Sequence, residues 1–312
     1  MDDLKDVAVI GGGPAGLSGA LMLARSRRSV VVVDAGEPRN RPATAMHGFL
    51  TRDGTPPGEL LAAGRAEVER YGARLVDGSV VTVKAGDGRF DLTLADGAVV
   101  SARRLLVTTG LVDELPAVPG VRELWGDQVI HCPYCHGWEV RDQAIGVLGS
   151  GPLSTHQALL FRQLSADVVF FGHTHPPSDD QRADLAARRI PVVDGAVSSL
   201  EIVDGRLTGV RLADGRSIPR QVVVVAPRFV ARSEVLESLG VEVVEQGPGI
   251  GWRVAADATG RTNVPGVWAA GNVTDLSAQV IVAAAAGATA ATHINADLVT
   301  EDVRRAAAGG ID

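Results

Sequence analysis

The sequence predicts an α/β protein with two doubly wound, mostly parallel sheets, and three observations support this prediction. An apolar strand, a glycine-rich turn, a small-residue helix and a second apolar strand follow one another between residues 7 and 34. The same order recurs, less regularly, between residues 144 and 171. Near the end of the chain another apolar strand leads through Ala-Gly-Asn into a further helix. Alternation of this kind is typical of Rossmann-like domains, here two of them.

The first glycine-rich turn has the form G-x-G-x-x-G. Gly11 allows the tight turn, Gly13 lets the backbone approach a pyrophosphate, and Gly16 packs helix against strand. The helix that follows directs its N-terminus at the phosphates. Asp34 ends the second strand and can accept a hydrogen bond from a ribose hydroxyl. With strand, glycines, helix and acid all present, the pattern favours dinucleotide binding over a simple tight turn.

Composition excludes several classes of protein. The 312 residues suffice for about two domains. A net charge of -7 argues against general binding to nucleic acid or to anionic membranes. The start Met1-Asp2-Asp3 lacks the basic residues of a secretory signal, and the alanine-rich run after Gln279 is too short to span a bilayer. We therefore expect a cytoplasmic protein without structural disulfides.

Residues 38–60 carry many turn formers and predict a long loop. Asn40, Arg41, Thr44 and His47 stand where the ribityl and phosphate groups of a cofactor can be contacted. For His47 a surface or capping role fits at least as well.

The rest of the first domain is predicted from short strands and two small-residue junctions. Ala98 to Ser101 and Leu105 to Gly110 are expected as separate strands, and the second ends in small residues suited to close approach of a ligand. Near the C-terminus, Asn272 follows a strand and can hydrogen-bond a ribityl hydroxyl or phosphate. A helix begins near Gln279, and its positive end can stabilise negative charge on a reduced ring.

The second strand–glycine–helix unit departs from the first in two ways. Ser154 stands at the third glycine position of residues 149–154, where a small residue is tolerated. An NADPH site would place arginines after the next strand, and an NAD site an acid. Residues 171–177 instead have the sequence Phe-Gly-His-Thr-His-Pro-Pro, which argues against NADPH binding. His173 and His175 have metal-ligand spacing, but no third ligand is evident, so a solvated loop and no metal site are predicted.

Cys132 and Cys135 are the only cysteines of the chain. The spacing C-x-x-C suits thiol–disulfide exchange. By itself it leaves four interpretations open: a glutaredoxin-like site, half of a zinc site with His131 or His136, a C-x-x-C-H haem attachment, or a redox pair on a flavoenzyme.

The order of these motifs resembles the low-molecular-weight thioredoxin reductase family over nearly the whole chain. The shared features are a glycine-rich FAD fingerprint, a strand ending Thr-Thr-Gly, an inserted Rossmann domain with C-x-x-C near its start, and a terminal Gly-x-x-Ala-x-Gly-Asn segment. The resemblance implies an FAD-binding domain made of residues 1–113 and 244–312. It also implies an inserted NAD(P)-like domain at 114–243, which carries the cysteine pair, and a homodimer.

The motif positions and the resemblance together assign FAD to one set of residues. These are Gly11, Gly13, Pro14, Ala15, Gly16, Asp34, Asn40, Arg41, Thr44, His47, Val80, Gly110, Gly271, Asn272, Gln279 and Val280. Two positions differ from the family pattern: Asn272 stands where Asp is usual, and Ala278 where Arg is common. Asn and Asp both accept a hydrogen bond, so FAD binding is still expected.

The third departure is the missing His-Arg-Arg cluster of NADPH-dependent members, at residues 171–177. The sequence C-P-Y-C-H-G-W-E at residues 132–139 is more similar to the FAD-dependent dithiol oxidases that close disulfides in small natural products. The gliotoxin, holomycin and romidepsin pathways use such enzymes. Tyr134 and Trp138 suit a small apolar substrate, although either can also be a core residue.

The resemblance implies a mechanism. A substrate dithiolate attacks the disulfide, gives a mixed disulfide through Cys132, and closes its own disulfide while releasing the reduced pair. Cys135, the flavin-proximal thiol by resemblance, passes the electrons to FAD, and dioxygen then yields hydrogen peroxide. His136 or His131 can take the thiol proton, although a structural role fits either as well.

Three alternatives stay open. The first is an NAD(P)H-dependent thioredoxin or disulfide reductase, and a ferredoxin-driven reductase is a smaller possibility. A non-enzymatic switch that uses flavin and thiols is the third. Haem attachment requires export, a zinc site needs further ligands, and glutaredoxin is a small separate fold, so these interpretations are set aside.

Overall fold

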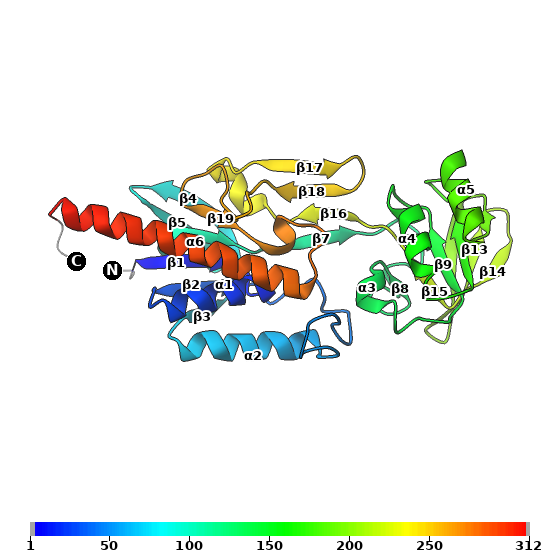
Figure 1. Cartoon of the computed structure of the whole chain (residues 1–312), viewed down its shortest axis with the longest axis horizontal. Coiled ribbons are helices and arrows are strands. Elements are labelled where there is room, and N and C mark those ends of the chain that lie inside the picture. Colours follow the sequence, from blue (N-terminus) through cyan, green and yellow to red (C-terminus); the bar gives the residue numbers. More distant parts are fainter. Residues whose placement is uncertain (1–3, 310–312) are drawn as a thin grey trace.

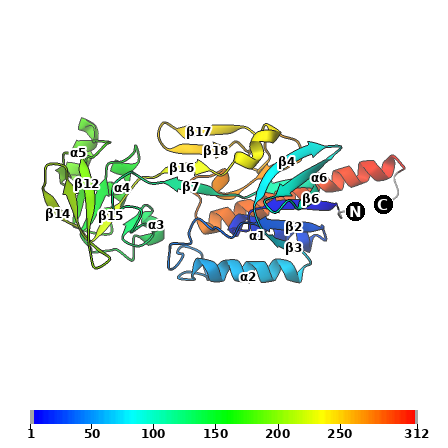
Figure 2. The same ribbon diagram turned by 180° about the vertical axis from the view of Figure 1, so that it is seen from behind.

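The computed structural model describes residues 4–309. The prediction that the chain has no secretory signal rests on residues 1–3, which lie outside that range. The molecule is elongated, with a larger domain that carries both ends of the described chain and a smaller domain at the opposite end (Figure 1). Two strands that run side by side connect the domains (Figures 1 and 2).

The larger domain is built on a seven-stranded sheet of order β3-β2-β1-β6-β5-β4, with β19 also paired to β6. Strands β1, β2, β3, β6 and β19 are parallel, and β4 and β5 form an antiparallel extension. Its elements are β1 (Lys5–Ile10), α1 (Pro14–Arg25), β2 (Val30–Asp34), α2 (Pro57–Arg70), β3 (Arg74–Asp77), β4 (Val80–Gly86), β5 (Arg89–Leu94), β6 (Val99–Val107), β19 (Val267–Ala269), η2 (Gly271–Val273) and α6 (Val280–Ala307).

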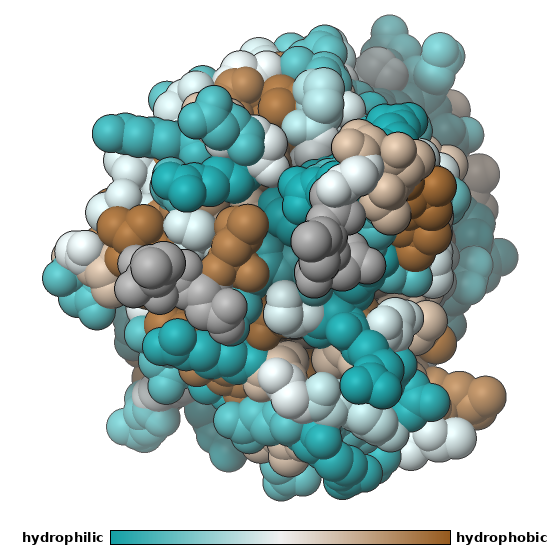
Figure 3. Space-filling view, turned by 90° about the vertical axis from the view of Figure 1, so that its left-hand side faces the viewer, coloured by the Kyte–Doolittle hydropathy of each residue, from teal (hydrophilic) through white to brown (hydrophobic). Residues whose placement is uncertain are grey.

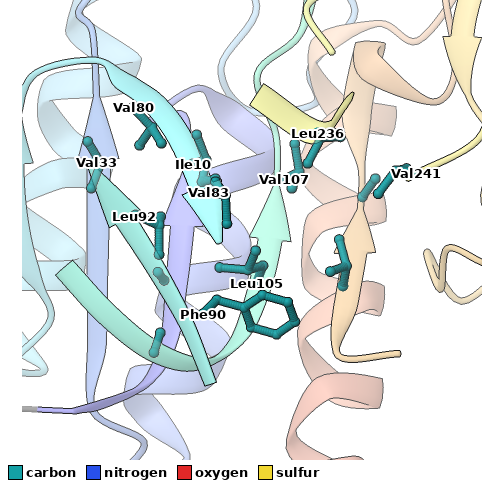
Figure 4. Close-up of a cluster of buried hydrophobic side chains, with 14 of the residues drawn as sticks. Ile10, Val33, Val80, Val83, Phe90, Leu92, Leu105, Val107, Leu236 and Val241 are labelled. Atoms are coloured by element: carbon teal, nitrogen blue, oxygen red, sulfur yellow. The ribbon is translucent and has the colours of Figure 1, made fainter. Parts of the chain in front are cut away.

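The parallel strands are buried on both faces, as their continuous apolar runs require. Along β1, Ala8 and Ile10 pack with Leu105 in the cluster that Figure 4 shows, toward β4, β5 and a short helix, while Val7 and Val9 pack against α1 and α6. Truncation of one such fully buried leucine to alanine costs about 2–5 kcal/mol.

Strand β6 corrects one prediction. Ala98 to Ser101 and Leu105 to Gly110 are not separate strands, because Arg103 and Arg104 between them do not break the ladder. Both arginines are paired with carboxylates, which makes a charged stretch tolerable in a buried strand. The strand ends at Val107, so the Thr-Thr-Gly that follows is a loop.

Helices α1 and α6 cross at glycines. A Cβ at Gly19 would lie 3.1 Å from the carbonyl oxygen of Gly287, and a Cβ at Gly287 would collide with the backbone of Ala15. Gly287 is therefore needed for close helix packing. The crossing brings the N-termini of both helices to the same end of the sheet (Figure 1).

The two domains are joined by a four-stranded sheet of order β17-β18-β16-β7. Its elements and the short helix beside them are β7 (Leu111–Glu114), β16 (Arg228–Ala231), η1 (Glu234–Leu239), β17 (Val243–Gly247) and β18 (Gly251–Val254). β16 pairs with β7 and β18, and η1 packs on β4, so the chain has returned to the larger domain by residue 228. The sequence predicts that residues 227–234 cross back to the first domain, whereas the boundary that the resemblance implies, at residue 244, stays a prediction.

The smaller domain has a five-stranded parallel sheet of order β11-β10-β9-β15-β8 and a three-stranded antiparallel sheet. Its elements are β8 (Val129–Ile130), α3 (Pro133–His136), β9 (Ile145–Leu148), α4 (Ser154–Phe161), β10 (Val168–Phe171), α5 (Asp179–Ala187), β11 (Val192–Val193), β12 (Val197–Val203), β13 (Arg206–Leu212), β14 (Ser217–Pro219) and β15 (Val222–Val224). The predicted fold class, two Rossmann-like doubly wound domains, is confirmed. None of the described helices is long and apolar enough to cross a membrane.

An ionic network joins α6 to the central strands β1 and β6 of the main sheet. Arg103 donates to Asp6 at 2.9 Å and to Asp302 at 2.6 Å, and Arg104 donates to Asp297 at 2.6 Å and to Glu301. This end of the molecule is mostly hydrophilic, with hydrophobic residues in small separate groups (Figure 3).

Because of this network, the free energy of unfolding changes with pH in the acid range. Burial by itself raises the pKa of Glu301, but the hydrogen bond and charge of Arg104, with Arg103 and Arg305, outweigh it and hold this pKa below its ordinary value. The unfolded chain therefore binds the proton more tightly, and the contribution of Glu301 is present above about pH 4.3 and lost as pH falls through the lowered pKa.

We predict that Glu301→Gln lowers the free energy of unfolding by about 1 kcal/mol at pH 7 and by less at pH 3. Urea unfolding at both pH values measures this. Glu114→Gln, in an exposed ion pair with Arg228, is the matched control and should change stability little at either pH. A loss that is equal at pH 7 and pH 3 would contradict the role of the charge.

Candidate functional site

A cavity of about 840 Å³ extends from the glycine-rich turn of the larger domain to the cysteine pair of the smaller one. Helix α3 lies at the edge of the smaller domain that faces the larger one (Figures 1 and 2). Of the residues assigned from sequence, the cavity is lined by Gly11, Gly13, Pro14, Ala15, Asp34, Asn40, Val80, Gly110, Gly271, Asn272, Gln279, Val280, His131, Cys132, Cys135 and His136.

The glycine-rich turn has the geometry of a phosphate cradle. Gly11 has φ +106°, and a Cβ there would lie 2.5 Å from the carbonyl oxygen of Thr108. The Gly12 N–H donates to Asp34 Oδ1 at 3.0 Å, which fixes the carboxylate beneath the turn. At Gly13 a Cβ would meet nothing within 4 Å, so the backbone there faces open space. The turn thus leaves room for a pyrophosphate.

Two helix N-termini meet at this cavity. Helix α1 begins at Pro14 and α6 begins at Val280; neither has a side chain capping its first turn, and neither first turn contains an acid. Their backbone N–H groups therefore remain available to a negatively charged group. The cradle, Asp34 and these two termini fit a dinucleotide cofactor.

Asn272 offers an acceptor to this cavity. Its Nδ2 donates to the carbonyl oxygens of Asp275 at 3.0 Å and Ala278 at 2.9 Å, which uses both amide hydrogens. The side chain has only its Oδ1 left for a ligand, and that oxygen suits a hydroxyl rather than a phosphate.

Four residues assigned to the cofactor do not line the cavity, namely Gly16, Arg41, Thr44 and His47. Gly16 lies behind the turn, where a Cβ would be 2.7 Å from Thr108 Oγ1. Arg41 donates to the carbonyl of Gly36. His47 lies 3.4 Å from both Asp53 and Glu139. The assignment of these four residues to the cofactor stays a prediction, and His47 joins its loop to the smaller domain through Glu139.

Arg39 has a role that no sequence motif indicates. Its Nε and Nη2 donate to the two carboxylate oxygens of Asp113 in β7, at 2.8 and 2.7 Å. Its guanidinium lies 5.3 Å from the ring centroid of Phe229 in β16, and Nη2 is 3.5 Å from Nε2 of His131. Arg39 thus joins the loop, both connecting strands and the smaller domain. Only the turn-rich composition marked this loop as special.

His131 is held in place by this group. Its ring stacks on Trp125 with centroids 5.7 Å apart and meets the edge of Phe229 at 5.9 Å. Burial, and then the charge of Arg39, lower the pKa of His131 to about 4. An imidazole with so low a pKa is a weak base at neutral pH, so the geometry favours a positioning role for His131 over proton transfer.

The cysteine pair forms a disulfide at the start of α3. The N–H groups of Cys135 and His136 both donate to the Cys132 carbonyl, at 3.3 and 3.2 Å. At Gly137 a Cβ would collide with the Pro133 carbonyl, so glycine is required for this turn to close. Because both cysteines line the cavity, the disulfide can exchange with a thiol that enters it.

His136 lines the same cavity, directly after Cys135. Both of its ring nitrogens are buried, and neither has a hydrogen-bond partner in the described part of the chain. Burial lowers the pKa of His136, while Glu139 opposes this shift and His47 adds to it. A neutral imidazole with a free nitrogen can accept a proton, so His136 fits the role of base better than His131 does.

The second glycine-rich turn differs from the first. The N–H groups of Ser150 and Gly151 both donate to Ser154 Oγ at 3.2 Å. The Ser154 side chain therefore engages backbone donors that a bound pyrophosphate would use. On α5, Arg182 is paired with Asp194 at 2.6 Å.

His173 is engaged by the protein. Its Nδ1 accepts the Val197 N–H at 3.0 Å. No cluster of three metal-binding side chains occurs between residues 4 and 309.

Fold and site together define an oxidoreductase with two dinucleotide-type domains and a redox disulfide between them. The family model for pyridine nucleotide-disulphide oxidoreductases matches residues 5–288, and the chain belongs to that family. The relatives found include several named thioredoxin reductases, which confirms the predicted resemblance. Membership of this family implies flavin binding.

Three relatives show the extent of the similarity. Thioredoxin reductase sirT of Leptosphaeria maculans is 30% identical over 96% of this chain and 95% of its own. Thioredoxin reductase tcpT of Claviceps purpurea (strain 20.1) is 39% identical over 48% of each, so the chain spans about half the length of that relative. The crystal structure of HlmI is 49% identical, with a TM-score of 0.93 over 98% of this chain and 96% of that one.

The lowered pKa of His131 leads to a prediction about stability. The unfolded state takes up this proton near pH 6.5 and the folded state only near pH 4, so protonation destabilises the fold progressively between those values. We expect His131→Phe, which keeps an aromatic ring beside Trp125, to flatten the decline in stability between pH 6.5 and pH 4. Chemical denaturation across this range measures it; an unchanged slope would show that His131 is not held neutral.

Proposed function

We propose that this protein is an FAD-dependent dithiol oxidase that closes an intramolecular disulfide in a small dithiol, with dioxygen as electron acceptor. One observation carries the proposal: the Cys132–Cys135 disulfide and an unpartnered His136 share a cavity with the cradle for the cofactor. A dithiol that enters this cavity meets an oxidant and a base together. We also propose a homodimer in the cytoplasm.

The residues of the chain have separate roles in the proposed reaction. A substrate thiolate attacks Cys132, which forms a mixed disulfide and releases Cys135 as thiolate. His136 takes the proton of the second substrate thiol, whose sulfur then displaces Cys132 and closes the substrate disulfide. Bound FAD would take two electrons from the reduced pair and deliver them to dioxygen, which leaves as hydrogen peroxide. Net, one dithiol and one dioxygen give one disulfide and one peroxide.

Two features of the smaller domain support the oxidase over a reductase. Residues 171–177 lack the arginines that grip the 2′-phosphate of NADPH, and Arg182 is engaged by Asp194. Ser154 Oγ occupies backbone donors of the second glycine-rich turn.

The second candidate is an NAD(P)H-dependent thioredoxin or disulfide reductase. The names of the relatives and the retained strand–glycine–helix unit favour it. A flavin and thiol switch without turnover is the non-enzymatic alternative.

The first test compares two electron donors. We expect the purified flavoprotein to consume oxygen with a small dithiol such as dithiothreitol, and its flavin absorbance to bleach slowly or not at all with NADPH. Cys135→Ser should abolish the dithiol-dependent oxygen uptake. Rapid bleaching by NADPH would favour the reductase, and absence of turnover with either donor would favour the switch.

The second test concerns the base. His136→Asn should lower kcat with the dithiol by about 10²-fold and remove a protonation step from the pH–rate profile, because His136 directly follows Cys135 and both of its ring nitrogens lack a partner in the described part of the chain. His293→Asn, on an exposed position of α6, is the control and should behave as wild type. An unchanged pH profile in His136→Asn would assign the proton to another group.

A further inference from the structure

A second hollow, of about 580 Å³, lies beside the disulfide and is not part of the cavity described above. It is formed by the turn after His47 and by the outer surface of α3 and the turn that follows it. Pro133 and Tyr134 line both hollows, so the second one borders the segment that follows Cys132. The remaining lining residues are His47, Gly48, Asp53, Trp138, Glu139 and Leu164.

Two aromatic side chains form the apolar part of this hollow. Tyr134 is 67% and Trp138 66% exposed, more than any other aromatic residue in the described chain, so the alternative that they are core residues is wrong. The Arg141 guanidinium lies 4.2 Å from the centroid of the Trp138 ring and donates to the Trp138 carbonyl at 2.7 Å. One face of the indole is thus covered and held, which leaves the ring ordered before any ligand arrives.

The opposite part of the hollow is acidic. Asp53 and Glu139 both lie 3.4 Å from the single imidazole of His47, one at each ring nitrogen. Hydrogen bonds from the Gly48 N–H and from His47 lower the pKa of Asp53. Two carboxylates therefore face one imidazole, and the balance of charge favours ligands that donate hydrogen bonds or carry positive charge.

We propose that this hollow is a recognition subsite for the substrate, which holds a planar ring that bears N–H donors. The ring stacks against Trp138 and Tyr134, and its N–H groups donate to Glu139 and Asp53. This inference rests on the proposed function, because it places the body of the dithiol here while its sulfur atoms reach Cys132 past Pro133. It narrows the substrate class from any apolar dithiol to a planar, nitrogen-bearing one.

Binding can be tested without turnover. The probes are 2-aminobenzimidazole, a planar ring with N–H donors, and quinoline, a planar ring without them. We expect calorimetry to show that 2-aminobenzimidazole binds the holoprotein more tightly than quinoline does. Trp138→Ala should weaken its binding about five- to tenfold, and Glu139→Gln should weaken it but leave quinoline unaffected. Trp252→Ala, which removes a part-exposed tryptophan from β18, is the matched control. Equal affinity in wild type and Trp138→Ala would overturn the subsite.

Turnover provides the second measurement. With 1,2-benzenedimethanethiol, an aromatic dithiol that closes a six-membered disulfide, Trp138→Ala should raise KM about five- to tenfold at unchanged kcat, while oxidation of dithiothreitol, which has no aromatic ring, stays as in wild type. An equal rise in KM for both dithiols would also overturn the subsite. If the wild-type protein oxidises neither dithiol, the proposed function fails, and the binding measurement still decides whether the hollow recognises such rings.

Discussion

The ion pair between Arg39 and Asp113 is the contact on which the arrangement of the site depends. It fixes the first connecting strand to the loop of the larger domain, and the same guanidinium covers Phe229 of the second strand and faces His131. His131 is joined directly to Cys132. The position of the disulfide above the cofactor cradle is therefore set by one largely buried, bidentate pair, and removal of either partner would leave a charge without compensation.

The opposite side of the cavity depends on close packing. Because Gly19 and Gly287 let α1 and α6 approach to backbone contact, two helix N-termini open on the same space. A Cβ at Gly271 would lie 2.9 Å from the Cβ of Ala15, which shows how tightly the two segments are held together. The electrostatic character of the cradle thus follows from the small residues that the helices share, and no charged side chain is needed to produce it.

The role of a residue can be predicted from the sequence where that residue acts through its immediate neighbours in the chain. The glycine turn, Asp34, the disulfide and the residues around Asn272 all follow from local motifs, and the structure places them in one cavity. The role of a side chain cannot be predicted in this way where it acts across a domain boundary. Arg39 and His47 contact residues that are distant in the sequence, and no sequence pattern indicates which strands pair with β16. Such long-range pairings depend on topology, which periodicity and composition do not contain.

The side-by-side course of β7 and β16 has an evolutionary consequence. Glu114 and Arg228 are opposite each other in this antiparallel pair and are joined at 2.6 Å, so the smaller domain leaves and re-enters the larger one at almost the same point. Loss or exchange of the whole segment between them would require only a short loop and would leave every strand of the larger sheet paired. The disulfide-bearing domain can in this way be replaced as a single unit while the larger domain is kept.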